Sequence, residues 1–248
     1  KIMTNYRLTL EYNGTNYCGW QLQQSTMSVQ ERLEQALHQL FGQAITTTAA
    51  GRTDAGVHAL GQVVSFTANK IYPPERVKAA INSLIKPDSI RVLNCQHVAA
   101  DFSARFSAIK RYYRYHIINN QDLSVFKRNL VWHYPNKTLD VTAMQQGANY
   151  LLGHHNFTSF RAAECQARRV EISIDSIDIK RQQDEITIDV SARSFLHHMV
   201  RNIVGSLINV GNGNWPPQKI QTILAAQDRT QAGVTAPACG LYFVQVDY

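Results

Sequence analysis

The stretch ITTTAAGRTDAGVHALGQVVSF, residues 45–66, decides how the first half of this chain folds. Residues 45–49 and 62–66 are rich in β-branched and aromatic side chains, which predicts two strands. The loop between them, residues 51–58, places one carboxylate, Asp54, beside one guanidinium, Arg52, between two glycines. Glycines tolerate backbone angles closed to other residues and allow close approach of a ligand. The pattern therefore predicts a loop that presents Asp54 from a rigid sheet.

The chemistry available to this loop follows from its two charges. The guanidinium of Arg52 favours the ionised form of Asp54, and an aimed carboxylate can act as a nucleophile or a base. Asp, Thr and Gly are also ordinary turn formers, so a plain turn is the competing interpretation. The flanking strands favour function, because chemistry is usually carried by loops on a rigid scaffold.

The elements before residue 105 are expected in the order β-α-β-β-α-β. A strand over 6–12 precedes a helix that starts at a capping box around Ser28 and runs to about Leu40. After the two strands of the loop region, Pro73 and Pro74 introduce a helix to about Ile85, and a strand follows over 90–98. This order is the split ferredoxin-like pattern, an antiparallel sheet with helices on one face.

The second half is expected to begin near Phe106 and to be built similarly. We predict an α+β fold of two ferredoxin-like-derived halves, residues 1–105 and 106–248, which form a shared, mostly antiparallel sheet flanked by helices. The elements expected in the second half are strands over 111–118, 170–179, 185–190 and 241–246 and helices over 141–152, 195–210 and 217–226.

Composition narrows the class of partner. Lys plus Arg number 25 against 18 Asp plus Glu in 248 residues, a net charge of +7, which favours polyanionic partners. The four cysteines lack the paired spacing of a zinc or redox site, so we expect reduced, mostly buried thiols. With no apolar run of roughly 18 residues and no signal core, we expect a cytoplasmic protein without a membrane partner.

Residues 110–115, KRYYRY, alternate cations with aromatic rings. The two-residue period of a strand puts Arg111, Tyr113 and Tyr115 on one face and the other three side chains on the opposite face. Rings interleaved with cations can stack a base and neutralise its phosphate. A core strand whose cations lie along the surface explains the same pattern, and both interpretations stay open at this point.

The helix expected over 195–210 has an apolar stripe, with His198, Arg201, Asn202 and Gly205 on the opposite side. An arginine there is by default a solvated surface group, although Gly205 removes bulk where another group approaches. The adjacent histidines at 154–155 and 197–198 diverge if helical, so we expect no metal. Neither a GxxxxGK loop nor a GxGxxG turn is present, so we expect no nucleotide cofactor.

The loop and its continuation through residues 59–63 resemble the signature of the tRNA pseudouridine synthase family, in the class that acts on the anticodon stem-loop. Four further stretches match in family order, so the resemblance covers nearly the whole chain. They are residues 17–21, 102–106, 156–161 and 197–202.

The resemblance implies isomerisation of uridine to pseudouridine at tRNA positions 38, 39 and 40, without cofactor or metal, by a homodimer that grips tRNA. It implies that Asp54 is essential, that Arg52 and Arg201 hold it as a carboxylate, and that Tyr113 stacks on the uracil, with neighbouring Tyr112 as the main risk of misassignment. Further contacts with the substrate are expected from His58, Arg161, Lys110, Arg111 and Leu241.

Lys127, Arg128, Arg161, Arg168 and Arg169 all belong to the second half, and a two-subunit arrangement could line them along an RNA groove.

Two other interpretations of the chain stay open. A non-catalytic RNA-binding or chaperone protein on ferredoxin-like sheets explains the charge and Tyr113 equally well. It does not explain Arg52 beside Asp54. A metal-dependent hydrolase using Asp54, His58 and the histidine pairs is the third alternative.

Overall fold

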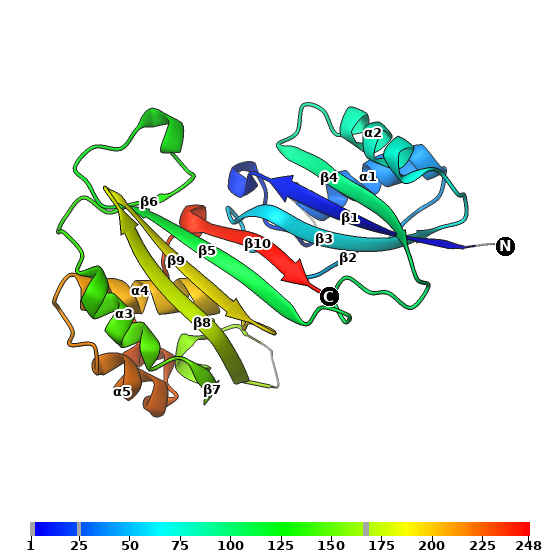
Figure 1. Cartoon of the computed structure of the whole chain (residues 1–248). Coiled ribbons are helices and arrows are strands. Elements are labelled where there is room, and N and C mark those ends of the chain that lie inside the picture. The colour runs from blue at the N-terminus through cyan, green and yellow to red at the C-terminus, as the bar shows by residue number, and fades with distance from the viewer. Residues whose placement is uncertain (1–2, 24–25, 166–168) are drawn as a thin grey trace. The chain divides into compact units, whose positions relative to one another are not determined.

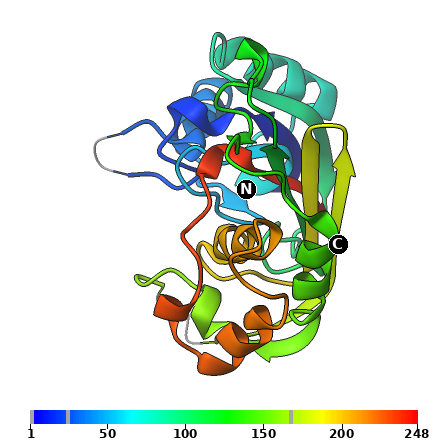
Figure 2. The same cartoon turned by 90° about the vertical axis from the view of Figure 1, so that its left-hand side faces the viewer.

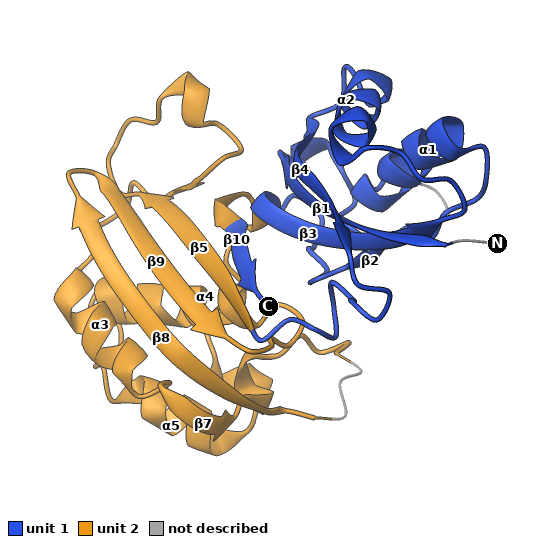
Figure 3. Cartoon of the chain, turned by 45° about the vertical axis from the view of Figure 1, so that its right-hand side comes forward, with its two compact units in different colours: residues 1–109, 242–248 blue, residues 110–241 orange. Residues whose placement is uncertain are grey.

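The computed structural model describes residues 3–23, 26–165 and 169–248. The chain forms two compact units, coloured separately in Figure 3. Unit 1 contains residues 1–109 and 242–248, and unit 2 contains residues 110–241. This division differs from a single boundary after residue 105, because the last strand of the chain returns to unit 1 and pairs with a strand there.

Unit 1 has the β-α-β-β-α-β order predicted from the sequence, followed by the returning strand. Its antiparallel strands lie in the order β4-β1-β3. The start of β3 pairs in parallel with β10, and its later part pairs with β2. Helices α1 and α2 lie together on one face of this sheet (Figure 1). The elements are β1 (Thr4–Tyr12), α1 (Val29–Phe41), β2 (Thr48–Ala49), β3 (His58–Ala68), α2 (Pro74–Leu84), β4 (Ile90–Val98) and β10 (Leu241–Asp247).

Helix α1 begins and ends where local chemistry demands. The Ser28 hydroxyl accepts a hydrogen bond from the Glu31 amide at 3.1 Å, as the capping box predicts. Gly42 ends the helix with a left-handed φ of 69°, which glycine adopts without steric cost. The buried stripe faces the sheet and contains Val29, Leu33, Ala36, Leu37 and Phe41.

Strand β2 is shorter than the strand expected over 45–49. The carboxylate of Glu34 on α1 accepts hydrogen bonds from both the backbone amide and the hydroxyl of Thr47, at 2.8 and 2.9 Å. That amide is therefore satisfied by a helix side chain, and only Thr48 and Ala49 pair with β3.

The two faces of the unit 1 sheet are covered differently. Under the helices, Tyr6 stacks on Phe66 with ring centroids 5.0 Å apart. On the other face, the guanidinium of Arg7 lies 4.6 Å from the ring centroid of Tyr248, and the Ser65 hydroxyl accepts from the Ala104 amide at 3.0 Å. The stretch 102–106 therefore covers the sheet, which gives this part of the family pattern a structural reason.

In unit 2 the strands pair antiparallel in the order β5-β9-β8-β7, with β6 parallel to the end of β5. Helices α4 and α5 lie on one side of β8 and β9 (Figure 2). Strands β6 and β7 were not predicted. The elements are β5 (Lys110–Ile118), β6 (Trp132–His133), α3 (Val141–Asn149), β7 (Gly153–Asn156), β8 (Glu171–Gln182), β9 (Glu185–Ala192), α4 (Met199–Gly211) and α5 (Lys219–Ala226).

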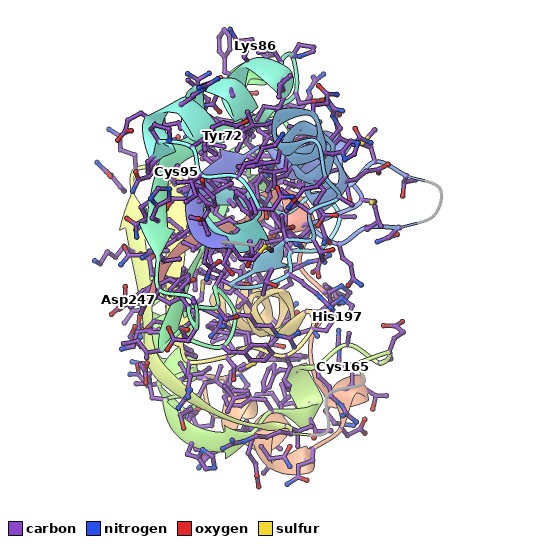
Figure 4. The ribbon with its side chains drawn as sticks, turned by 90° about the vertical axis from the view of Figure 1, so that its right-hand side faces the viewer. Tyr72, Lys86, Cys95, Cys165, His197 and Asp247 are labelled. Atoms are coloured by element: carbon purple, nitrogen blue, oxygen red, sulfur yellow. The ribbon has the colours of Figure 1, made fainter. Side chains whose placement is uncertain are left out.

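Two other sequence expectations concern the chain as a whole. None of the helices in the described ranges has the length and apolar content needed to cross a bilayer. The four cysteines are free thiols, as expected. Cys95, labelled in Figure 4, is buried, whereas the other three are partly exposed, so the expectation of mostly buried thiols is wrong. Burial raises the pKa of Cys95 to about 12, so this thiol stays protonated at neutral pH.

Candidate active site

The Asp54 loop connects β2 to β3 in unit 1, and its side chains alternate between the interior and the surface. Thr53 and Val57 are buried, whereas Arg52 is exposed and Asp54 is partly exposed. Because adjacent side chains of an extended segment point to opposite sides, burying Thr53 turns Arg52 and Asp54 outward. The loop thus presents the two charged groups from a buried anchor.

The segment before α1 holds this loop through its backbone. The Trp20 amide donates to the Thr53 carbonyl at 3.0 Å, and Gly19 forms an isolated β-bridge with Asp54. Gly19 has a φ of +106°, and a β-carbon there would lie 2.5 Å from the Thr53 carbonyl oxygen. Only glycine suits this crossing. The stretch 17–21 of the family pattern therefore positions the Asp54 loop.

His58 packs inside unit 1. Its Nδ1 accepts from the Gly14 amide at 3.0 Å, its ring centroid lies 4.6 Å from that of Tyr242 on β10, and its exposed fraction is 1%. A side chain so enclosed offers almost no surface in unit 1, and a contact of His58 with the substrate stays a prediction. No local sequence pattern indicates that Gly14 and Tyr242 surround His58, because both lie far from it in the sequence.

A small polar network lies in the core beneath the loop. The hydroxyls of Tyr12 and Thr53 are 2.7 Å apart, and the Gln62 amide nitrogen donates to the Gly51 carbonyl at 2.7 Å. Burial raises the pKa of Tyr12 to about 12, against the smaller lowering effect of its hydrogen bonds with Thr53 and Gln62. The phenol is therefore neutral at neutral pH.

Tyr113 lies on β5 in unit 2, opposite Val190 of β9. It is buried, and its ring meets Phe195 edge to face at a centroid distance of 5.0 Å. Burial alternates along β5 as the two-residue period predicts, with Tyr113 and Tyr115 buried and Tyr112 partly exposed. The neighbouring tyrosines therefore lie on different faces of the sheet.

The opposite face of β5 carries ion pairs. Arg114 pairs with Asp189 at 2.6 Å, and Lys110, predicted to contact the substrate, pairs with Asp175 at 3.0 Å. Arg111, which shares the face of Tyr113, donates to the Arg193 carbonyl. Glu185 accepts from Lys127 at 2.8 Å and bonds His116 at 2.7 Å; these two partners, Lys127 first, outweigh desolvation and lower the pKa of Glu185.

Helix α4 begins at Met199, four residues later than the sequence pattern predicts at Phe195. His198 has a left-handed φ of 61°, so the chain turns at this residue before the helix can start. Arg201 then lies in the first turn, and its Nε donates to the Ala236 carbonyl at 2.8 Å. The Ala236 amide donates back to the Arg201 carbonyl at 3.1 Å, so the residue is held by two bonds.

The side of α4 expected to face solvent is covered by residues 229–236. Asn202 is fully buried; its Oδ1 accepts from Arg229 at 3.0 Å and Thr235 at 2.7 Å, and its Nδ2 donates to the Phe160 carbonyl at 2.9 Å. A β-carbon on Gly205 would lie 1.7 Å from the Val234 carbonyl oxygen. The close approach inferred at Gly205 is therefore made by the chain itself.

The stretch 156–161 is also more buried than a surface loop. Phe157 and Phe160 are fully buried, and Arg161 is partly exposed. Of the other basic residues considered for a groove, Arg128 and Arg169 are exposed, and Arg168 lies outside the described residues.

The residues predicted for catalysis are divided between the units. Unit 1 contains Arg52 and Asp54, and unit 2 contains Tyr113 and Arg201. Leu241, predicted to contact the substrate, is buried at the start of β10.

Comparison with known proteins identifies the family. A family model described as tRNA pseudouridine synthase matches residues 9–107 and 148–248. The chain belongs to the tRNA pseudouridine synthase family. A curated relative from Bartonella tribocorum, named tRNA pseudouridine synthase A, is 46% identical over 248 residues, covering 99% of this chain and 100% of the relative. One of the same name from Azorhizobium caulinodans is 46% identical over 246 residues, covering 99% and 95%.

The family model covers some of the candidate catalytic residues and not others. Arg52, Asp54 and Arg201 lie inside them, whereas Tyr113 lies in the unmatched interval between residues 107 and 148. The curated relatives align across nearly the whole chain, a range that includes position 113.

Replacing Asn202 tests the packing of α4. Asn202→Ala removes the hydrogen-bond partner of the Phe160 carbonyl, Arg229 and Thr235. Because these groups then lose that partner, we expect the free energy of unfolding to fall by about 3 kcal/mol. Urea unfolding followed by circular dichroism measures it. Asn149→Ala, at an exposed helix end, serves as the control and should change stability by less than about 0.5 kcal/mol. A loss below about 1 kcal/mol for Asn202→Ala would contradict this account.

The raised pKa of the buried Tyr12 phenol predicts that the protein loses stability at alkaline pH. Its pKa is 10.0 in the reference state and about 12 when folded, so the phenol ionises first in the unfolded chain. Its contribution to stability is complete below pH 10 and is lost as the pH rises towards about 12. The difference in unfolding free energy between the parent and Tyr12→Phe should therefore shift against the parent from pH 9 to 11.5. A difference independent of pH would show that Tyr12 titrates normally.

Proposed function

We propose that this protein isomerises uridine to pseudouridine in tRNA, at positions 38, 39 and 40 of the anticodon stem-loop, with Asp54 as its essential carboxylate. The observation that carries the proposal is the 46% identity, over essentially the whole chain, to relatives named tRNA pseudouridine synthase A. The outward presentation of Asp54 from a buried anchor supports the role of this residue.

The reaction conserves the atoms of the nucleotide. The bond between N1 and C1′ breaks, the uracil turns, and C5 bonds to C1′; the proton leaves C5, and N1 gains one. No oxidant, reductant or metal is required by this balance, so the proposal includes no cofactor. Because a stacked base hides its glycosidic bond, the nucleotide is extruded before reaction. Exclusion of water then protects the cleaved intermediate from hydrolysis.

Four residues carry the proposed chemistry. Asp54 acts on the nucleotide, Arg52 and Arg201 favour its ionised form, and Tyr113 stacks on the uracil. The double link between Arg201 and Ala236 supports an electrostatic role, because a charge held in place needs no reorganisation during reaction.

Residues outside this group are proposed to contact other parts of the tRNA. We propose that Arg161, Lys110 and Arg111 contact the RNA backbone and that Leu241 limits water near the base. The net charge of +7 supports attraction to tRNA. A cytoplasmic location follows from the proposed substrate, since tRNA is found there.

Asp54→Asn tests the chemistry directly. The amide keeps the shape of the side chain but cannot act as a carboxylate, so we expect tritium release from C5-labelled tRNA to fall by roughly three orders of magnitude or more. Affinity for tRNA should stay within about threefold. Asp101→Asn, an exposed carboxylate elsewhere in unit 1, should retain parental activity. A tRNA with cytidine in place of uridine at positions 38–40 should release no tritium when incubated with the parent protein.

The other outcomes decide between interpretations. Parental activity in Asp54→Asn would remove Asp54 from the mechanism. Tight tRNA binding without tritium release by the parent would favour the non-catalytic RNA-binding protein. Release from the tRNA that lacks uridine at 38–40 would place the target elsewhere.

We also propose that the protein acts as a homodimer, because the resemblance implies that two subunits grip one tRNA. Sedimentation equilibrium at the concentration of the activity assay should give 56 kDa, twice the chain mass of 28.0 kDa. A mass of one chain under those conditions would reject the dimer while leaving the proposed chemistry intact.

A further inference from the structure

The polar network beneath the Asp54 loop is placed to control the reaction. Tyr12, at the end of β1, and Gln62, within β3, point into the core under the loop and are 3% and 0% exposed. The Tyr12 hydroxyl meets the Thr53 hydroxyl at 2.7 Å, and the Gln62 amide nitrogen reaches the Gly51 carbonyl at 2.7 Å. The same nitrogen lies 3.5 Å from the Tyr12 hydroxyl, so the two contacts adjoin.

The stability of the fold does not explain why residue 62 is a glutamine. Within the described part of the chain, no group donates a hydrogen bond to Oε1 of Gln62, although this oxygen is buried. A buried acceptor without a donor destabilises a fold, and an apolar side chain of similar size would avoid that cost. The group that the structure uses is the amide nitrogen, whose partner is the backbone of the Asp54 loop.

The two contacts hold the loop on either side of Arg52 and directly before Asp54. Gly51 is held through its carbonyl and Thr53 through its side chain, while the Trp20 amide holds the Thr53 carbonyl at 3.0 Å. Thr53 is therefore fixed from its side chain and from its backbone. The position of the next Cα, that of Asp54, follows from these contacts.

We propose that Tyr12 and Gln62 are positioning residues, which hold the Asp54 loop so that its carboxylate meets the nucleotide in reactive geometry. The inference rests on the proposed catalytic role of Asp54. Displacing a reacting group by about an ångström can lower a rate a hundredfold without any change in the reacting groups themselves. Substrate binding, spread over the whole tRNA, depends much less on this loop.

The test compares kcat, KM for tRNA and thermal midpoint in Tyr12→Phe and Gln62→Met. We expect kcat to fall roughly 10- to 100-fold in each, with KM within about threefold. Gln62→Met also removes the buried oxygen that lacks a donor, so its thermal midpoint should change by no more than a few degrees. Loss of rate without matching loss of stability is the result that a purely structural role would not produce.

Thr53 offers a cycle that isolates the hydroxyl contact. Thr53→Val should lower kcat as much as Tyr12→Phe, and the double variant should lose no more than either single one, because all three remove the same bond. Thr53→Ser keeps the hydroxyl and should retain most of the parental kcat. Full additivity of the two single effects would show that the hydroxyls act independently, which would contradict the proposed link.

Tyr6 is a matched control. Tyr6 lies on the same strand as Tyr12 and is fully buried. Its hydroxyl accepts a hydrogen bond at 2.8 Å from the backbone amide of Tyr72, which is labelled in Figure 4 and lies outside the Asp54 loop. Tyr6→Phe should lower the thermal midpoint while kcat stays parental. Equal loss of kcat in Tyr6→Phe and Tyr12→Phe would overturn the proposal, since any buried tyrosine hydroxyl would then suffice.

Asp54→Asn, assayed in parallel, separates the positioning role of Tyr12 and Gln62 from the catalytic role of Asp54. If Asp54→Asn is inactive while Tyr12→Phe and Gln62→Met keep parental kcat, the positioning role is wrong and the role of Asp54 stands. If Asp54→Asn is active, the catalytic role of Asp54 itself fails. Should Tyr12→Phe not fold, Gln62→Met decides alone, because parental kcat in that variant contradicts the proposal.

Discussion

The hydrogen bond from the Trp20 amide to the Thr53 carbonyl, 3.0 Å long, joins the segment before α1 to the loop between β2 and β3. Because Gly19 has no side chain, the two backbones come close enough for this bond to form. With Thr53 held inward, Arg52 and Asp54 are left on the outside of unit 1. Residues 17–21 and residues 51–58, two separate stretches of the family pattern, thus contact each other and together position Asp54.

Unit 2 uses a comparable principle on a helix. Arg201 is fixed by Ala236, and the neighbouring Asn202 ties α4 to Phe160 and to the segment around Arg229. Both units therefore place a charged group beside a buried polar residue that satisfies its partners internally. Such networks make a site rigid, because each unmade hydrogen bond in the interior is costly.

The sequence predicted what depends on near neighbours and missed what depends on distant ones. The cap of α1 at Ser28 and the alternation along β5 follow from local chemistry, and both are present. The burial of His58 depends on Gly14 and Tyr242, which no local pattern brings near it. The covered side of α4 depends on Thr235, more than thirty residues later. The left-handed turn at His198 is a local feature without a local signal in the sequence.

The return of β10 to unit 1 makes the order of synthesis matter. Residues 4–98 supply the rest of this sheet, yet the partner for the start of β3 leaves the ribosome only after all of unit 2. Until then that edge of β3 is open, and an open edge invites pairing with another chain. A chain that ends before Leu241 therefore lacks the strand that pairs with the start of β3, and its sheet is unfinished.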